Sequence, residues 1–90
     1  MLKETYHPNA YLPNLRNVRP GLRARTKILG ALEKGSKDAK TIAGEATAHY
    51  NTVMHHLKLL QSEGIVRRAS GKPSIWTLTG AGQKRLVSTG

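Results

Sequence analysis

Acid–base and metal chemistry have few candidates in this chain of 90 residues. Its five carboxylates are each at least four positions from the next, at Glu4, Glu33, Asp38, Glu45 and Glu63. A catalytic acid pair would therefore have to arise from folding alone. The lack of cysteine excludes disulfides, thiolate zinc sites and a cysteine nucleophile. Because no phosphate loop or nucleophile elbow is present either, we expect no enzymatic activity.

The histidines are the remaining candidates for metal ligands. His55 and His56 are adjacent, and adjacent side chains on a helix diverge by about 100°. His49 and His56 would lie about two turns apart, too far along a helix to share an ion. We therefore expect neither a metal nor a cofactor.

Positive charge dominates the composition. Lys and Arg number 15 against five acids, which gives a formal net charge of +10 and a pI near 10.6. So much charge on a small domain predicts an anionic partner, nucleic acid before an acidic membrane. The sequence has neither an apolar signal segment nor a run of about 18 apolar residues, so we expect a cytoplasmic protein, nucleoid-associated if it binds DNA.

Proline placement divides the chain into two parts. Residues 1–20 hold three of the four prolines and show no sustained apolar period. We read them as a basic N-terminal arm, extended or disordered unless it docks on something. Residues 21–90 form one domain of size typical for a single core.

The spacing of apolar residues and the positions of helix-ending and turn residues predict the helices and strands of that domain. Helices are expected over residues 21–34, 39–46 and 50–62, each followed by a stop signal or a turn. Gly30 inside the first helix suggests a close neighbour. Two strands, 65–69 and 74–78, flank a turn and predict a hairpin. A last, short basic helix is expected over residues 80–88.

Helix, short helix, tight turn, helix and hairpin is the order of a winged helix-turn-helix. Ala43 is the small residue over which the second helix of the motif crosses, and Val53 is that helix's buried anchor. The run 52–60, followed by Glu63-Gly64-Ile65-Val66, resembles the recognition helix and next strand of ArsR-like bacterial and archaeal repressors. Two residues depart from the pattern: Thr47 stands where a turn glycine is expected, and His49 where a Ser or Thr cap is usual. The expected motif core is Ile42, Ala43, Val53, Leu57 and Leu60.

The resemblance implies an α+β winged helix-turn-helix. It has a three-helix core, a two-stranded hairpin wing, a short C-terminal helix and, here, the N-terminal arm. The partner would be double-stranded DNA, with residues 50–62 as the recognition helix. Its outward face carries amides, hydroxyls and imidazole, groups suited to base edges. The expected base-reading residues are Tyr50, Asn51, Thr52, Met54 and His55.

Basic residues beside this helix are expected to hold the DNA backbone. Charge on a wing contributes affinity more than sequence choice. The expected backbone contacts are His49, Lys58, Arg67, Arg68, Lys72, Arg23 and Arg25. His56 is expected to be a half-buried packing residue that also contacts phosphate, and Trp76 to pack in the core, with nucleobase stacking as its alternative.

Three functions remain open from the sequence. The first is a sequence-specific DNA-binding transcriptional regulator, which could act as a homodimer on a palindromic site. The second is an architectural or chromatin-type DNA-binding protein without sequence preference. The third is a winged-helix protein-interaction module of a larger assembly.

Overall fold

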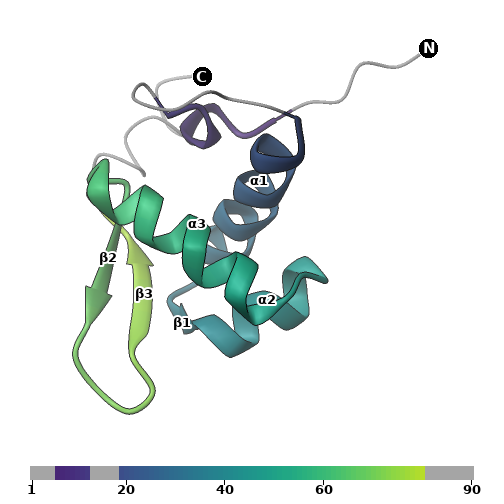
Figure 1. Cartoon of the computed structure of the whole chain (residues 1–90). Coiled ribbons are helices and arrows are strands. Elements are labelled where there is room, and N and C mark those ends of the chain that lie inside the picture. Colours follow the sequence, from purple (N-terminus) through teal and green to yellow (C-terminus); the bar gives the residue numbers. More distant parts are fainter. Residues whose placement is uncertain (1–5, 13–18, 81–90) are drawn as a thin grey trace.

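The computed structural model describes residues 6–12 and 19–80. A short 3-10 helix, η1 (Pro8–Ala10), precedes α1 (Arg19–Glu33), and a two-residue strand β1 (Lys37–Asp38) leads into α2 (Ala39–Ala46). Helix α3 (Tyr50–Ser62) and the hairpin of β2 (Val66–Ala69) and β3 (Ile75–Leu78) follow. The three helices pack together, and the loop between β2 and β3 projects beyond them (Figure 1).

The helices follow their local signals closely. The bounds of α2 and α3 are those predicted. Helix α1 begins two residues before the predicted start, at Arg19, because Pro20 fits the first turn of a helix, where its missing N–H has no partner to lose. A Cβ built on Gly30 meets nothing within 4 Å, so the close neighbour that we inferred for this glycine is wrong.

The turn between α2 and α3 uses a non-glycine residue in a left-handed conformation. Thr47 has φ 54° and ψ 48°. Its N–H donates to the Gly44 carbonyl at 3.4 Å, and the Ala48 N–H donates to the Ala43 carbonyl at 3.0 Å. These bonds satisfy carbonyls at the end of α2, so Thr47 does the work of the expected glycine at a conformational cost of about 1–2 kcal/mol.

The sheet has three antiparallel strands in the order β1-β3-β2. In the hairpin, Val66 faces Leu78 and Ala69 faces Ile75. Strand β1 adds Lys37 opposite Trp76; it was not predicted, because two residues are too few to show alternation. This third strand ties the start of α2 to the wing.

The core lies between the helices and one face of the sheet. Trp76, 1% exposed, packs there as predicted. The five expected motif-core residues are all buried in the same cluster: Ile42, Ala43, Val53, Leu57 and Leu60. The buried residues of α2 and α3 pack against each other and so fix how the two helices cross. The crossing in turn determines which edge of α3 remains exposed.

Residues 6–12 do not run free as an extended arm. Ala10 and Leu12 are fully buried in the core cluster, and η1 lies beside the start of α1 (Figure 1). The segment docks on the chain's own domain, because the apolar side chains at 10 and 12 gain burial there. The predicted helix over residues 80–88 lies, after Gly80, outside the described residues. Within the described ranges, no helix is long and apolar enough to cross a membrane.

Candidate nucleic-acid interface

The outer edge of α3 is exposed along its whole length. Asn51, Thr52, His55 and Lys58 are exposed, whereas Val53, Leu57 and Leu60 on the opposite stripe are buried. This division follows from the 3.6-residue period, since positions three and four apart share a face. The edge presents an amide, a hydroxyl, an imidazole and one ammonium, all within reach of a ligand from outside.

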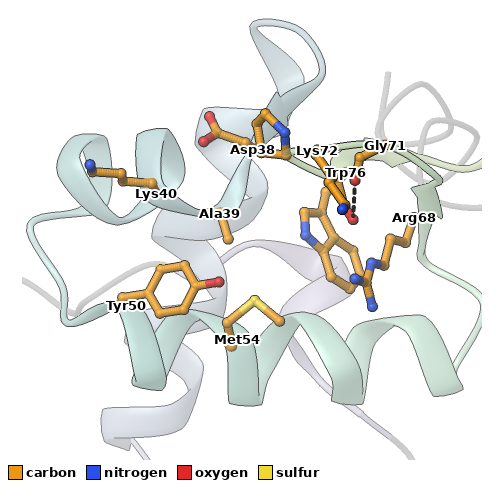
Figure 2. A pocket seen from close by; sticks show the side chains of 11 residues that line it. Asp38, Ala39, Lys40, Tyr50, Met54, Arg68, Gly71, Lys72 and Trp76 are labelled. Carbon is orange, nitrogen blue, oxygen red and sulfur yellow. Dashed lines mark hydrogen bonds between the residues drawn. The ribbon is translucent and has the colours of Figure 1, made fainter.

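Tyr50 and Met54 lie apart from that edge and face the wing. Both line a groove between α3, the start of α2 and the hairpin, with a volume of about 430 Å³. Figure 2 shows the Tyr50 hydroxyl and the Met54 sulfur directed into it. Of the five residues predicted to read bases, three therefore share the outer edge, and these two form a wall of the groove.

The groove combines an apolar floor with a basic rim. Trp76 forms the floor, and the guanidinium of Arg68 lies 5.8 Å from its ring centroid, a cation–π geometry (Figure 2). Lys40 and Lys72 add two further cations to the lining. The Asp38 carboxylate opposes them; the hydroxyl of Thr41 donates to it, and this bond holds the pKa of Asp38 below its ordinary value.

Lys40 and Asp38 were missed by sequence reasoning. They reach the wing because β1 pairs with β3 and places Asp38 opposite Ile75. The sequence carries no clear signal for this strand, because it has only two residues and Lys and Asp are uncommon in strands. The wing loop itself is held by Ser74, whose hydroxyl donates to the Gly71 carbonyl at 3.3 Å.

The other residues predicted to contact the DNA backbone lie on different elements of the domain. Arg67 and Arg68 are both exposed, but neighbouring side chains on a strand point to opposite faces, so Arg67 faces away from the groove that Arg68 lines. His49 is exposed before α3, and its side chain makes no capping bond to the helix. Arg23 is exposed on α1, and Lys72 lies at the wing tip.

Arg25 is not part of the exposed basic surface. It is 3% exposed, and its Nε donates to the Ala10 carbonyl at 2.6 Å. The prediction that Arg25 contacts the DNA backbone is therefore wrong, because its charge is committed inside the domain and burial lowers its pKa.

His56 lies beside Arg25, 8% exposed. Burial, followed by the charge of Arg25 and by His55, lowers the pKa of His56 to about 4. The side chain is thus a neutral packing group rather than a half-exposed phosphate ligand. In the part of the chain that the structure describes, no cluster of three metal-ligating side chains occurs.

No family model and no curated protein sequence matches the chain, but solved structures do. A MarR family transcriptional regulator from Silicibacter pomeroyi superposes with a TM-score of 0.68 at 21% identity, over 73% of this chain and 46% of that one. This chain thus spans about half of that regulator's length. A second structure is the homodimeric winged helix-turn-helix DNA-binding domain of a possible ArsR-family regulator from Mycobacterium bovis. It superposes with a TM-score of 0.64 at 25% identity, over 73% of this chain and 62% of that one.

A third structure is more similar in sequence. The Zalpha domain of PKZ from Carassius auratus, solved in complex with Z-DNA, gives a TM-score of 0.59 at 36% identity, over 63% of this chain and 92% of that domain. The TM-scores of all three exceed 0.5, so this chain shares their overall fold. With its crossed helices, strained turn and hairpin wing, the chain has the winged helix-turn-helix fold and is similar in structure to regulators of the ArsR and MarR types.

Proposed function

We propose that this protein is a sequence-specific, double-stranded-DNA-binding transcriptional regulator that acts in the cytoplasm on the nucleoid. The observation that carries the proposal is the exposed, largely uncharged edge of α3. Such an edge makes few salt bridges of its own and leaves its donors and acceptors available to base edges in a major groove.

The roles on this edge follow from side-chain chemistry. The Asn51 amide can bond an adenine through two hydrogen bonds, and the Thr52 methyl can contact a thymine methyl. His55 offers a further donor or acceptor in the same row, and Lys58 a phosphate contact. Sequence choice would rest on these exposed residues, each worth about 1–3 kcal/mol of discrimination where the contact is bidentate.

The groove between α3 and the wing would hold the strand beside the major groove. Lys40, Arg68 and Lys72 supply positive charge for phosphates, while Tyr50 and Met54 offer apolar surface to a sugar. We thus assign Tyr50 and Met54 to the DNA backbone and leave base reading to the outer edge. Arg67 and Arg23 would contact flanking phosphates.

A selection of bound duplexes from a random pool tests sequence specificity. A regulator should enrich a defined motif and retain it against excess random duplex. If one subunit neutralises about five phosphates, log K should fall with log salt at a slope near −4.5. For an architectural protein, excess random duplex would displace the selected duplex. For a protein-interaction module, the double substitution Asn51→Ala and His55→Ala would leave DNA affinity unchanged.

The number of protein chains bound to each duplex can be measured on the same selected complex. The Mycobacterium bovis relative is a homodimer, and a two-fold symmetric pair of subunits demands a palindromic site. We propose that this protein binds as a homodimer. Native mass measurement on the selected complex should give two chains per duplex, and one chain per duplex would contradict it.

Recognition of left-handed DNA is a second candidate, favoured by one observation. The protein is 36% identical to a Zalpha domain solved with Z-DNA and covers 92% of that domain. Here the helix and wing would select duplex shape rather than base sequence. Circular dichroism of an alternating dC-dG duplex distinguishes the two: inversion of the spectrum on adding protein supports this candidate, and an unchanged right-handed spectrum excludes it.

A further inference from the structure

The N-terminal segment, residues 6–12, is attached to α1 at several points. Ala10 and Leu12 are fully buried. The His7 backbone N–H donates to the Thr26 hydroxyl at 2.9 Å, and His7 Nε2 lies 2.5 Å from a Glu33 carboxylate oxygen. Apolar burial and directional bonds together give this segment one position on the domain.

Arg25 extends that attachment from the segment to α3. Its Nε donates to the Ala10 carbonyl at 2.6 Å, and its Nη1 lies 3.4 Å from Nδ1 of His56. A guanidinium holds its donors in a fixed planar fork. One buried side chain on α1 therefore joins the N-terminal segment to the recognition helix.

The contact defines the state of His56. A guanidinium can only donate, so Nδ1 of His56 accepts and the ring proton lies on Nε2. The His56 ring in turn meets the His55 ring edge-on, with centroids 5.1 Å apart and planes at 68°. His55 is exposed on the outer edge of α3, so the chain of contacts ends at a residue proposed to read DNA.

A directional contact matters here because the buried stripe of α3 is made largely of apolar side chains. Val53, Leu57 and Leu60 hold the helix against the core, but apolar contacts have no preferred direction. A hydrogen bond fixes orientation, and recognition groups must be held within about 0.5 Å of their productive positions.

We propose that Arg25 is a positioning residue for the DNA-reading edge of α3, and that the N-terminal segment reaches the recognition helix through it. The inference rests on the proposed sequence-specific function. It assigns the segment a part in sequence reading that requires no DNA contact from residues 6–12 themselves.

Substitutions of Arg25 separate its donors from its charge. Arg25→Met keeps the aliphatic stem and removes every donor. Arg25→Lys keeps the charge, but one ammonium cannot reproduce the two-ended fork. Lys34→Met is the matched control, because Lys34 is an exposed cation just after α1. His56→Leu removes the contact from its other end, and His56→Asn keeps an acceptor near the position of Nδ1.

Two measurements are made on the full chain. Imidazole nitrogen shifts in the free protein should report the Nε2–H tautomer of His56, and a tautomer mixture in Arg25→Met. The ratio of Kd for scrambled and selected duplexes should then fall about tenfold in Arg25→Met and His56→Leu. His56→Asn should recover most of the ratio, and Lys34→Met should leave it unchanged.

The outcomes separate this inference from the function beneath it. A wild-type protein that binds selected and scrambled duplexes equally overturns sequence reading, and the positioning role with it. A wild type that discriminates, beside a folded Arg25→Met that discriminates equally, overturns the positioning role alone. If Arg25→Met does not fold, Arg25→Lys and His56→Leu decide by the same ratio.

Discussion

The guanidinium carbon of Arg68 lies 5.8 Å from the centroid of the Trp76 ring, across the pair that joins β2 to β3. The aromatic face attracts the cation, so the guanidinium is held over the groove floor while the side chain stays exposed. The tryptophan is buried and the arginine exposed. The core thus orients a charge that belongs to the outer surface.

Removing that charge should weaken DNA binding of every sequence alike. We expect Arg68→Ala to lower affinity several-fold at low salt and to reduce the salt slope by about 0.9, the contribution of one phosphate. A salt series by fluorescence anisotropy measures both. Trp76 is the one tryptophan of the chain, so its emission should also change on DNA binding.

Lys34→Ala is the charge-matched control for this experiment, since Lys34 lies outside the groove and is exposed. An Arg68→Ala slope equal to that of the wild type would show that this guanidinium does not meet a phosphate.

Asn51→Ala should have the opposite signature. Its exposed amide is placed to read a base, so the loss should cost about 1–3 kcal/mol on the selected duplex and little on a scrambled one. Competition binding with both duplexes measures the difference. Ser62→Ala is a control at the other end of α3, where the hydroxyl donates to the Leu59 carbonyl at 2.7 Å. Equal losses on both duplexes would assign Asn51 to the backbone instead.

The parts of the fold that the sequence predicted are those set by local signals. Helices α2 and α3 have apolar stripes at helical spacing, and turn residues end them, so their bounds agree with the structure. The buried motif core follows from the same periodicity. The exposed edge of α3 follows in turn, because a helix that buries one stripe shows the opposite one.

The missed parts depend on contacts between distant residues. In the sequence, Arg25 resembles any basic residue on a helix surface. It is buried because a segment 15 positions earlier in the chain packs over it, and the Ala10 carbonyl accepts from its guanidinium. The two residues of β1 carry no periodicity, yet they bring Lys40 to the groove. Tyr50 and Met54 lie on the flank of α3, where the periodicity alone does not say which neighbour covers them.

Gly30 offers a test of helix stability without a change at the proposed interface. A Cβ at this position meets nothing within 4 Å, and alanine loses less backbone entropy than glycine on forming a helix. We expect Gly30→Ala to raise the free energy of unfolding by about 0.5–1 kcal/mol. Urea unfolding measures it, and DNA affinity should stay constant. A loss of stability would reveal a clash that the geometry does not contain.

Thr47 offers a second test, in the turn itself. Glycine tolerates the left-handed conformation that costs a threonine about 1–2 kcal/mol, but it loses more entropy on folding, by about 0.5–1 kcal/mol. We therefore expect Thr47→Gly to stabilise the protein by up to about 1 kcal/mol. Thermal unfolding measures the shift, with Thr52→Gly, in the first turn of α3, as the destabilised comparison. A Thr47→Gly protein that melts below the wild type would mean that the side chain makes a contact worth more than the strain.

His56 should make stability fall in acid. Its pKa is about 4 in the folded protein, lowered by burial, Arg25 and His55, against about 6.5 in an unfolded chain. The unfolded state therefore takes up the proton first, so the free energy of unfolding is level above about pH 7 and falls between about pH 6.5 and 4. The loss from this group should be roughly 2–3 kcal/mol. His56→Asn cannot titrate, so the wild-type and variant urea midpoints should diverge across that interval. Parallel curves for the two proteins would mean that His56 takes up a proton in the folded protein as readily as in the unfolded chain, and would contradict an Nδ1 that accepts from Arg25.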